Sequence, residues 1–312
     1  MNILIIDEVH PILIDTLENA SCKLNYSPKI NAKQVEEIIA NYDGIIVRSK
    51  MKITSEIIDK SPKLKFIGRV GAGLENIDVD YAKSKNIRVF NSPEGNRDAV
   101  GEHAIGMILN LFNKINFANN EVKNGIWDRE ANRGIEIGGK TIGIIGYGNT
   151  GMAFAKKLSG FDVNILAYDK YKTDFSDKYV TEASLADIFA KTDILSFHVP
   201  LTKYTNKMFD AAFTSKFANN IYLINTSRGE VVDTNSLVDG LKNNKVIGAC
   251  LDVLEYEKLS FEDIFKNNDS EDFKYLVNAD NVILTPHIAG WTHQSYYKIS
   301  KVIADKVITE FL

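Results

Sequence analysis

The sequence predicts an α/β protein with two doubly wound parallel-sheet domains, and three observations lead to this prediction. Short apolar runs alternate with helical segments along the whole chain, which is typical of parallel sheets. A strand, a glycine turn and a helix follow one another in "TIGIIGYGNTGMAFAKKL", which begins only at Thr141. The final segment, 295–312, forms an amphipathic helix too short to be a domain, so we expect it to return to the first domain.

The first third of the chain has the pattern of a small α/β domain. Its apolar runs are short and bounded by polar residues, as expected of buried strands. Between two of them, Val35, Ile38 and Ile39 recur at helical spacing, which predicts a helix over 32–42. The predicted strands are 3–6, 44–47, 65–70 and 87–91.

The middle of the chain has the pattern of a larger domain, inserted into the first. A helix is predicted over 98–113, and a loop with Trp127 follows it. These patterns assign 1–98 and 290–312 to a substrate domain and 99–289 to a nucleotide domain. The predicted strands of the second domain are 141–145, 163–168, 194–199, 221–227, 246–253 and 281–287.

Composition argues against several classes of function. The 312 residues are 45% hydrophobic and 25% charged, with a formal net charge of −4. Basic residues form no long run and apolar residues form no membrane-length run, so we expect neither nucleic acid nor a membrane as partner. Cys22 and Cys250 lie in no metal-binding or redox motif, so we expect no metal. We expect a cytoplasmic location by default.

The sequence "GYGNTG" fits the pattern G-x-G-x-x-G of dinucleotide-binding Rossmann domains. Gly146 allows the tight turn, Gly148 allows a pyrophosphate to approach the backbone, and Gly151 allows the helix to lie close to the sheet. Asn149 and Thr150 complete this turn, where the helix N-terminus offers N–H groups and a partial positive charge to phosphates. The pattern predicts a cofactor site at these five residues.

An acidic residue extends the cofactor prediction. The strand after the glycine turn ends at Asp169, where a carboxylate can accept hydrogen bonds from both ribose hydroxyls and repel a 2′-phosphate. NAD is therefore expected rather than NADP, although Lys170 and Lys172 weaken the repulsion. A surface aspartate after a purely structural turn is the alternative interpretation.

Three side chains at or just after late strands suggest the chemistry: Arg228, Glu257 and His287. We expect them to converge, because ligands bind at the carboxyl ends of parallel strands. An imidazole, with an ordinary pKa of about 6.5, can accept or return a hydroxyl proton, and a carboxylate beside it stabilises the imidazolium. An arginine can bind a carboxylate through two hydrogen bonds. Taken alone, His287 also fits a turn histidine, Glu257 a solvated side chain and Arg228 a turn cap. The prediction of hydride transfer therefore depends on all three.

Together these motifs resemble the D-isomer-specific 2-hydroxyacid dehydrogenase family over nearly the whole chain. The resemblance implies that the catalytic Arg, Glu and His are the three residues above, that a Rossmann NAD domain is inserted into a flavodoxin-like substrate domain, and that a homodimer forms through the NAD domain. It also implies that His198, Pro200, Thr226, Asp252 and Gly290 line the NAD site. The matching segments are "HVPLT" (198–202), "NTSRGEVVD" (225–233), "ACLDVLEYE" (249–257), "TPHIAG" (285–290), "VRS" (47–49), "GRVGAGLENID" (68–78) and "NSPEGN" (91–96).

The chain departs from the family pattern just after Glu257. Lys258 stands where the family often has proline, and segment 258–280 is longer and more acidic than usual. Within it, "KNNDSEDFK" (266–274) is predicted to be a solvated loop. The role of this segment stays open.

Within the family, the resemblance is closest to the 3-phosphoglycerate dehydrogenases. It implies that the N–H groups of Ala72 and Gly73 bind the substrate carboxylate and that Arg48, Arg69 and Asn96 are candidates for further substrate contacts. A phosphorylated hydroxy acid carries three negative charges near neutral pH, and arginine suits phosphate. Solvated or ion-paired arginines are the alternative.

We therefore expect NAD-dependent oxidation of 3-phospho-D-glycerate to 3-phosphooxypyruvate, as in serine biosynthesis. A reductase of hydroxypyruvate, glyoxylate or D-lactate is the alternative within the family. An NAD-sensing protein of the corepressor type is the alternative outside the enzymes. Longer family members carry a C-terminal serine-sensing domain, and we expect no feedback by that route here.

Overall fold

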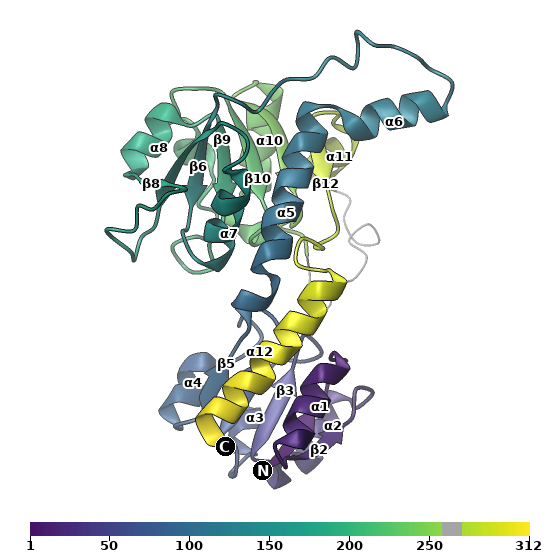
Figure 1. The fold of residues 1–312 in the computed structure, drawn as a ribbon, viewed down its shortest axis with the longest axis vertical. Helices are drawn as coiled ribbons and strands as arrows, with labels where there is room; N and C mark the ends of the chain where they lie inside the picture. The colour runs from purple at the N-terminus through teal and green to yellow at the C-terminus, as the bar shows by residue number, and fades with distance from the viewer. Residues whose placement is uncertain (258–269) are drawn as a thin grey trace. The chain divides into compact units, whose positions relative to one another are not determined.

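The computed structural model describes residues 1–257 and 270–312, which form two compact units (Figure 1). Unit 1 comprises Met1–Arg97 and Trp291–Leu312, and unit 2 comprises Asp98–Gly290. Each unit holds one parallel sheet with helices on both faces, which confirms the predicted fold class. Lys258 and the rest of the acidic segment up to residue 269 lie outside the described residues.

The sheet of unit 1 has five strands in the order β2-β1-β3-β4-β5, all parallel. This is the flavodoxin-like order, in which the direction of winding reverses between β1 and β3. The elements are β1 (Asn2–Ile5), α1 (Pro11–Asn19), β2 (Lys23–Tyr26), α2 (Ala32–Ile38), η1 (Ile39–Asn41), β3 (Gly44–Val47), α3 (Ser55–Asp59), β4 (Phe66–Arg69), α4 (Val79–Ser84), β5 (Arg88–Phe90) and α12 (His293–Phe311).

The returning helix α12 packs beside α1 on one face of this sheet (Figure 1). It buries Ile299 and Ile303 in a cluster with Ile3 of β1, while α2, α3 and α4 bury residues such as Val35 against the other face. The helix begins with a capping box, in which the Thr292 side chain accepts the N–H of the residue three positions on. The predicted return of the C-terminal helix to the first sheet is confirmed.

The sheet of unit 2 has seven parallel strands in the order β12-β11-β10-β9-β6-β7-β8. The order reverses between β6 and β9, as in Rossmann domains. The elements are α6 (Ile115–Lys123), β6 (Thr141–Ile145), α7 (Asn149–Leu158), β7 (Asn164–Tyr168), β8 (Thr181–Glu182), α8 (Leu185–Lys191), β9 (Ile194–Phe197), α9 (Ala211–Thr214), β10 (Ile221–Asn225), η2 (Gly229–Val231), α10 (Thr234–Lys242), β11 (Val246–Leu251), α11 (Glu271–Asn278) and β12 (Val282–Leu284).

Helices cover both faces of the second sheet. Helix α5 (Pro93–Phe112) begins in unit 1 and continues in unit 2, where Ala104 and Ile108 pack with Phe154 of α7. Helices α8 to α11 contribute to the hydrophobic cluster on the opposite face, which includes Leu237 of α10. None of the helices within 1–257 and 270–312 is long and apolar enough to cross a membrane.

The sequence-based prediction missed several elements at the periphery. Strands β2 and β8 lie at the sheet edges and hold no fully buried side chain, so they lack an apolar run. The prediction of a solvated loop over 266–274 is wrong from Glu271 onward, because α11 begins there. Ser270 caps this helix, and its apolar Phe273 and Leu276 are buried against unit 2.

Candidate active site

The three predicted catalytic residues follow three adjacent strands of unit 2. Arg228 lies after β10, Glu257 after β11 and His287 after β12, and these strands are neighbours in the sheet. Because all three strands are parallel, their carboxyl ends share one edge of the sheet. The topology therefore assigns the three residues to neighbouring loops.

His287 and Glu257 contact each other directly. The ring Nδ1 of His287 lies 2.6 Å from Oε2 of Glu257, and both side chains are partly exposed. The other carboxylate oxygen, Oε1, accepts the backbone N–H of Leu254 at 2.6 Å, which anchors the carboxylate to its own loop. An ionised carboxylate only accepts hydrogen bonds, so Nδ1 is the donor in this pair. In the neutral ring Nε2 then carries the lone pair, and this nitrogen can accept a proton.

The backbone of His287 is held in an unusual conformation by Asp252. His287 has a φ of +55°, a left-handed value that is uncommon outside glycine, and its N–H donates to the carbonyl oxygen of Asp252 at 2.8 Å. The buried Asp252 carboxylate accepts the N–H groups of Ile288 and Ala289, both at 2.8 Å, and the Thr285 hydroxyl at 2.5 Å. Asp252, predicted to line the cofactor site, thus makes its observed contacts with the loop that carries the histidine.

A second histidine joins this network from helix α5. Nε2 of His103 lies 3.0 Å from the hydroxyl of Thr285 and 3.5 Å from Oδ1 of Asp252. His103 was not predicted as a site residue, because it stands in an ordinary helical pattern and meets Thr285 only through tertiary packing. Gly290, another predicted cofactor residue, is the last residue of unit 2.

The turn that carries Arg228 packs against the loop that leads to Glu257. Arg228 donates through Nη1 to the Ser227 carbonyl oxygen at 2.7 Å, and its own carbonyl oxygen accepts the Asn225 amide at 2.9 Å. A Cβ at Gly229 would lie 2.1 Å from the carbonyl of Leu254, so only glycine permits this approach. The structure therefore brings His287 and Glu257 together and places the Arg228 turn directly against the loop that carries Glu257.

The glycine turn requires glycine at two of its positions and leaves open space beside a third. Gly146 has a φ of +96°, and a Cβ at Gly151 would lie 2.2 Å from the Gly146 carbonyl oxygen, so both positions need glycine for the backbone itself. By contrast, nothing lies within 4 Å of a Cβ placed at Gly148. The space beside Gly148, at the N-terminus of α7 where Asn149 and Thr150 begin the helix, is therefore open to a ligand.

Asp169 lies at the end of the next strand and binds the glycine turn. Its Oδ2 accepts the N–H of Tyr147 at 2.9 Å, and its Oδ1 accepts another backbone N–H. Lys172 donates to the carbonyl oxygen of Tyr147 at 2.7 Å, while the Nζ of Lys170 lies 3.2 Å from the ring centroid of Tyr204. Lys170 and Lys172, which were expected to weaken the repulsion of a 2′-phosphate, thus contact groups other than the Asp169 carboxylate.

Two further predicted cofactor residues differ in what their side chains can offer. The ring of His198 is buried, lies against Phe154 and bonds to the Ser196 hydroxyl at 2.9 Å, so only its backbone remains for a dinucleotide. The hydroxyl of Thr226 is buried and has no hydrogen-bond partner among the described residues. A buried hydroxyl without a partner is costly, so a bound polar group would satisfy it. Pro200 lies just after His198 and accepts a side-chain hydrogen bond through its carbonyl oxygen.

The predicted substrate residues lie in unit 1, at the carboxyl ends of β3 and β4. These strands pair with Val47 opposite Arg69, so Arg48 leaves the sheet beside the Arg69 position. The Nη1 of Arg69 occupies the place where a Cβ of Gly71 would be, which shows that this guanidinium lies over the turn after β4. Burial lowers the pKa of Arg48, an effect that the neighbouring Tyr296 and acidic residues oppose.

The turn after β4 is fixed at its ends and open in its middle. Gly71 exchanges hydrogen bonds with Ser92, its N–H donating to the hydroxyl at 2.9 Å and its carbonyl oxygen accepting the Ser92 N–H at 2.8 Å. The N–H groups of Ala72 and Gly73 donate to no residue within the described part of the chain. Within the same part, Oδ1 of Asn96 is buried without a hydrogen-bond partner. Such N–H groups can bind a carboxylate.

Comparisons with known proteins identify the NAD-binding domain and the relatives of the chain. Residues 105–289 match the family model described as "D-isomer specific 2-hydroxyacid dehydrogenase, NAD binding domain", which confirms the prediction of an NAD-binding domain. The chain is 35% identical over 286 residues to the hydroxypyruvate reductase of Thermotoga maritima, covering 91% of this chain and 90% of that protein. Among the described residues, no group of three potential metal ligands gathers at one place.

Two further relatives carry different names. The D-3-phosphoglycerate dehydrogenase of Archaeoglobus fulgidus is 32% identical over 310 residues, covering 99% of this chain but 57% of that protein, so the chain spans little more than half of its length. The D-lactate dehydrogenase of Aquifex aeolicus, solved with NAD and lactic acid, superposes with a TM-score of 0.82 at 30% identity, covering 98% of this chain and 94% of that one. The relatives of this chain are thus named for several different hydroxy or oxo acids.

Proposed function

The chain belongs to the D-isomer-specific 2-hydroxyacid dehydrogenase family, and from this premise we propose that it oxidises 3-phospho-D-glycerate to 3-phosphooxypyruvate with NAD. The observation that carries the proposal is the 2.6 Å contact between His287 and Glu257. It pairs a proton acceptor with a carboxylate at the strand ends of an NAD-binding domain. A reaction of this kind serves serine biosynthesis.

The proposed mechanism assigns proton transfer to His287. Nε2 accepts the proton of the substrate's C2 hydroxyl, and the ring becomes an imidazolium that Glu257 stabilises through the Nδ1 hydrogen bond. The guanidinium of Arg228 binds the substrate carboxylate and orients C2. Gly148 and Thr226 would help to hold NAD, which would supply the hydride acceptor for C2. In the reduction, His287 returns the proton to the carbonyl oxygen.

The proposed substrate class depends on the cationic and N–H groups of unit 1. Ala72 and Gly73 offer two backbone donors for the carboxylate, and Arg48 and Arg69 offer guanidinium groups for the phosphate. Asn96 contributes a buried amide oxygen that can accept a hydrogen bond from a substrate hydroxyl. These groups suit an acid with more negative charge than lactate or glyoxylate carries.

Steady-state rates with 3-phospho-D-glycerate, D-glycerate and D-lactate, in wild type and in Arg48→Ala, test the substrate. We expect Arg48→Ala to lower kcat/KM for phosphoglycerate about 10- to 100-fold, the range for a hydrogen bond to a charged group, and to affect D-lactate little. Faster turnover of D-lactate or glycerate than of phosphoglycerate by wild type would instead assign the chain to the reductases of small acids. If no hydroxy acid yields NADH while NAD still binds, the result would favour the alternative of an NAD-sensing protein over an enzyme.

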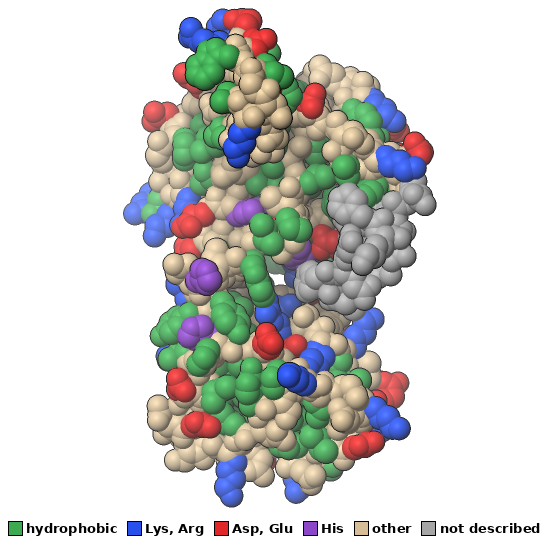
Figure 2. Space-filling view, turned by 90° about the vertical axis from the view of Figure 1, so that its right-hand side faces the viewer, with side chains coloured by type: hydrophobic (Ala, Val, Ile, Leu, Met, Phe, Trp, Pro, Cys, Tyr) green, Lys and Arg blue, Asp and Glu red, His purple; other side chains and the backbone are tan. Residues whose placement is uncertain are grey.

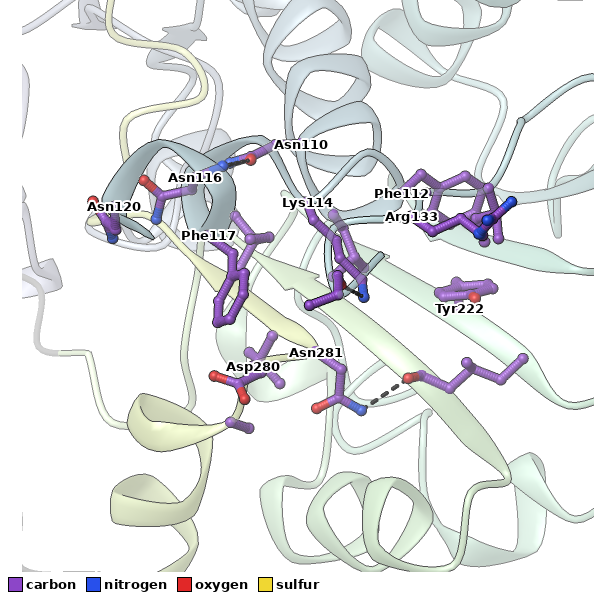
Figure 3. A pocket seen from close by; sticks show the side chains of 18 of the residues that line it. Asn110, Phe112, Lys114, Asn116, Phe117, Asn120, Arg133, Tyr222, Asp280 and Asn281 are labelled. Carbon is purple, nitrogen blue, oxygen red and sulfur yellow. Dashed lines mark hydrogen bonds between the residues drawn. The ribbon is translucent and has the colours of Figure 1, made fainter. Parts of the chain in front are cut away.

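We further propose that a homodimer forms through unit 2. Helix α6 buries none of its side chains, and it exposes Ile115, Phe117 and Val122, while Trp127 in the loop beyond it is 80% exposed. Figure 2 shows hydrophobic side chains interspersed with charged ones on the surface at the upper end of the view. Beside α6 lies a pocket of about 680 Å³, and the ring of Phe117 points into it toward Asp280 (Figure 3). Exposed apolar surface next to an open pocket supports contact with a second copy.

A further inference from the structure

The guanidinium of Arg48 lies over an aromatic side chain from the other end of the chain. Its Cζ is 4.0 Å from the ring centroid of Trp291 and 6.0 Å from that of Tyr296. Both distances are within the range of cation–π attraction. Arg48 follows β3, and Trp291 directly precedes the cap of α12, so the contact lies entirely within unit 1.

The backbone of Arg48 is fixed independently of its side chain. Oδ2 of Asp7 accepts the N–H groups of Arg48, Ser49 and Lys50 at 2.6, 3.1 and 3.2 Å. Asp7 and the neighbouring Glu8 are the acidic groups that act on the Arg48 charge. No described residue forms an ion pair with the guanidinium. The guanidinium of Arg48 is therefore positioned by its own aliphatic side chain and by the rings of Trp291 and Tyr296.

The packing of α1 against α12 holds that aromatic surface in place. The ring of Tyr296 meets the ring of His10 edge to face, with centroids 5.5 Å apart. His10 is itself fixed, because its Nδ1 accepts the N–H of Ile12 at 3.1 Å and its own N–H donates to the Ser300 hydroxyl at 3.1 Å. The Trp291 ring, 6.5 Å from that of Tyr296, is 59% exposed and packs on this support.

We propose that Trp291 is a positioning residue for Arg48, and that the pair, rather than the arginine alone, gives the site its affinity for the phosphate of a phosphorylated 2-hydroxy acid. A ring attracts a guanidinium through its face, whereas the N–H donors lie in the guanidinium plane. Stacking therefore leaves these donors available for two parallel hydrogen bonds to phosphate oxygens. It also lowers the entropy that a long side chain loses on binding. This inference rests on the proposed function.

Enzyme kinetics with matched variants test the inference. We expect Trp291→Ala to raise KM for 3-phospho-D-glycerate about three- to tenfold, with the increase on KM rather than kcat, and Trp291→Phe to restore most of the affinity. Tyr297→Ala is the control, because Tyr297 is an exposed aromatic residue on the adjoining helix α12 and its ring contacts His10 instead of Arg48. A KM in Trp291→Ala within twofold of wild type, while Arg48→Ala raises it strongly, overturns the inference and leaves the proposed function standing.

Fluorescence provides a readout that does not depend on turnover. The chain has two tryptophans, so the full-length Trp127→Phe variant reports on Trp291 alone. We expect 3-phospho-D-glycerate and inorganic phosphate to change its emission saturably and D-lactate to leave it unchanged, and we expect Arg48→Ala to abolish the change. Absence of any change with either phosphate compound overturns the inference. If wild type oxidises only unphosphorylated acids, the substrate proposal fails, and the titration with inorganic phosphate still decides whether Trp291 and Arg48 form an anion site.

Discussion

The ring Nδ1 of His287 lies 2.6 Å from Oε2 of Glu257, although 30 residues separate the two positions in the chain. The other carboxylate oxygen of Glu257 accepts the backbone N–H of Leu254, and this bond holds the Glu257 side chain in place. The histidine is fixed through its backbone, because Asp252 accepts the N–H groups of His287, Ile288 and Ala289. The contact assigns Nδ1 of His287 to the carboxylate.

This pair leads to a prediction about proton transfer. We expect His287→Gln to lower kcat/KM by about 10² to 10⁴, the usual contribution of a general acid or base. Glu257→Gln should lower it about 10- to 100-fold, because an uncharged amide no longer stabilises the imidazolium. NADH binding, measured by fluorescence, serves as the control and should stay at the wild-type affinity. Retention of more than a tenth of the activity by His287→Gln would contradict the assigned role.

Two glycines of the same turn should respond differently to alanine. Gly148→Ala should preserve the fold, because its Cβ meets nothing within 4 Å, but it should weaken NAD binding at least about tenfold by filling the ligand space. Gly151→Ala should reduce the free energy of unfolding by roughly 1–3 kcal/mol, because its Cβ collides with the backbone of Gly146. Calorimetric NAD titration and thermal unfolding of both variants check this. Equal NAD affinity in Gly148→Ala and wild type would refute a pyrophosphate site there.

The exposed apolar side chains after α5 predict the oligomeric state. We expect wild type to sediment as a dimer, and Trp127→Asp to dissociate at micromolar concentration, because a charge would be buried in the interface. Tyr171→Asp offers a control, since Tyr171 is 76% exposed on the same unit but away from α6 in sequence. Sedimentation velocity distinguishes the species. A monomeric wild type, or a dimeric Trp127→Asp, would contradict the proposed interface.

The buried histidine of unit 2 predicts a loss of stability in mild acid. Burial lowers the pKa of His198 to about 3. The unfolded chain, with a pKa of about 6.5, then binds the proton more readily, so the stabilisation from a neutral His198 is complete above about pH 6.5 and is lost as the pH falls toward the folded value. One such group contributes a slope of about 1.4 kcal/mol per pH unit between these limits.

Urea unfolding of wild type and His198→Gln between pH 7 and pH 5 checks this slope. The difference in the free energy of unfolding between the two proteins should shift by about 2 kcal/mol over this range, with the wild type losing more. Comparison of slopes, rather than of absolute stabilities, removes the cost of losing the bond to the Ser196 hydroxyl. Parallel curves would show that His198 is protonated as easily in the folded chain as in the unfolded one.

Local residue patterns were enough to predict the alternation of strands and helices, the glycine turn after residue 145 and the loops on which the charged residues stand. These features are recorded locally, because burial repeats with the period of each element and backbone turns require particular residues. The edge strands β2 and β8 and helix α11 escaped prediction for the same reason: their apolar content is low or interrupted, and neighbouring elements supply their stability.

The directions and contacts of the functional side chains, in contrast, depend on the packing of the whole fold. It directed Nδ1 of His287 to Glu257, turned the His198 ring into the core and left the Thr226 hydroxyl without a partner among the described residues. It also placed Trp291 over Arg48, a contact that depends on the packing of α1 against α12. Such contacts join residues far apart in the chain, and their energies depend on distances between side chains, which no local pattern of residues contains.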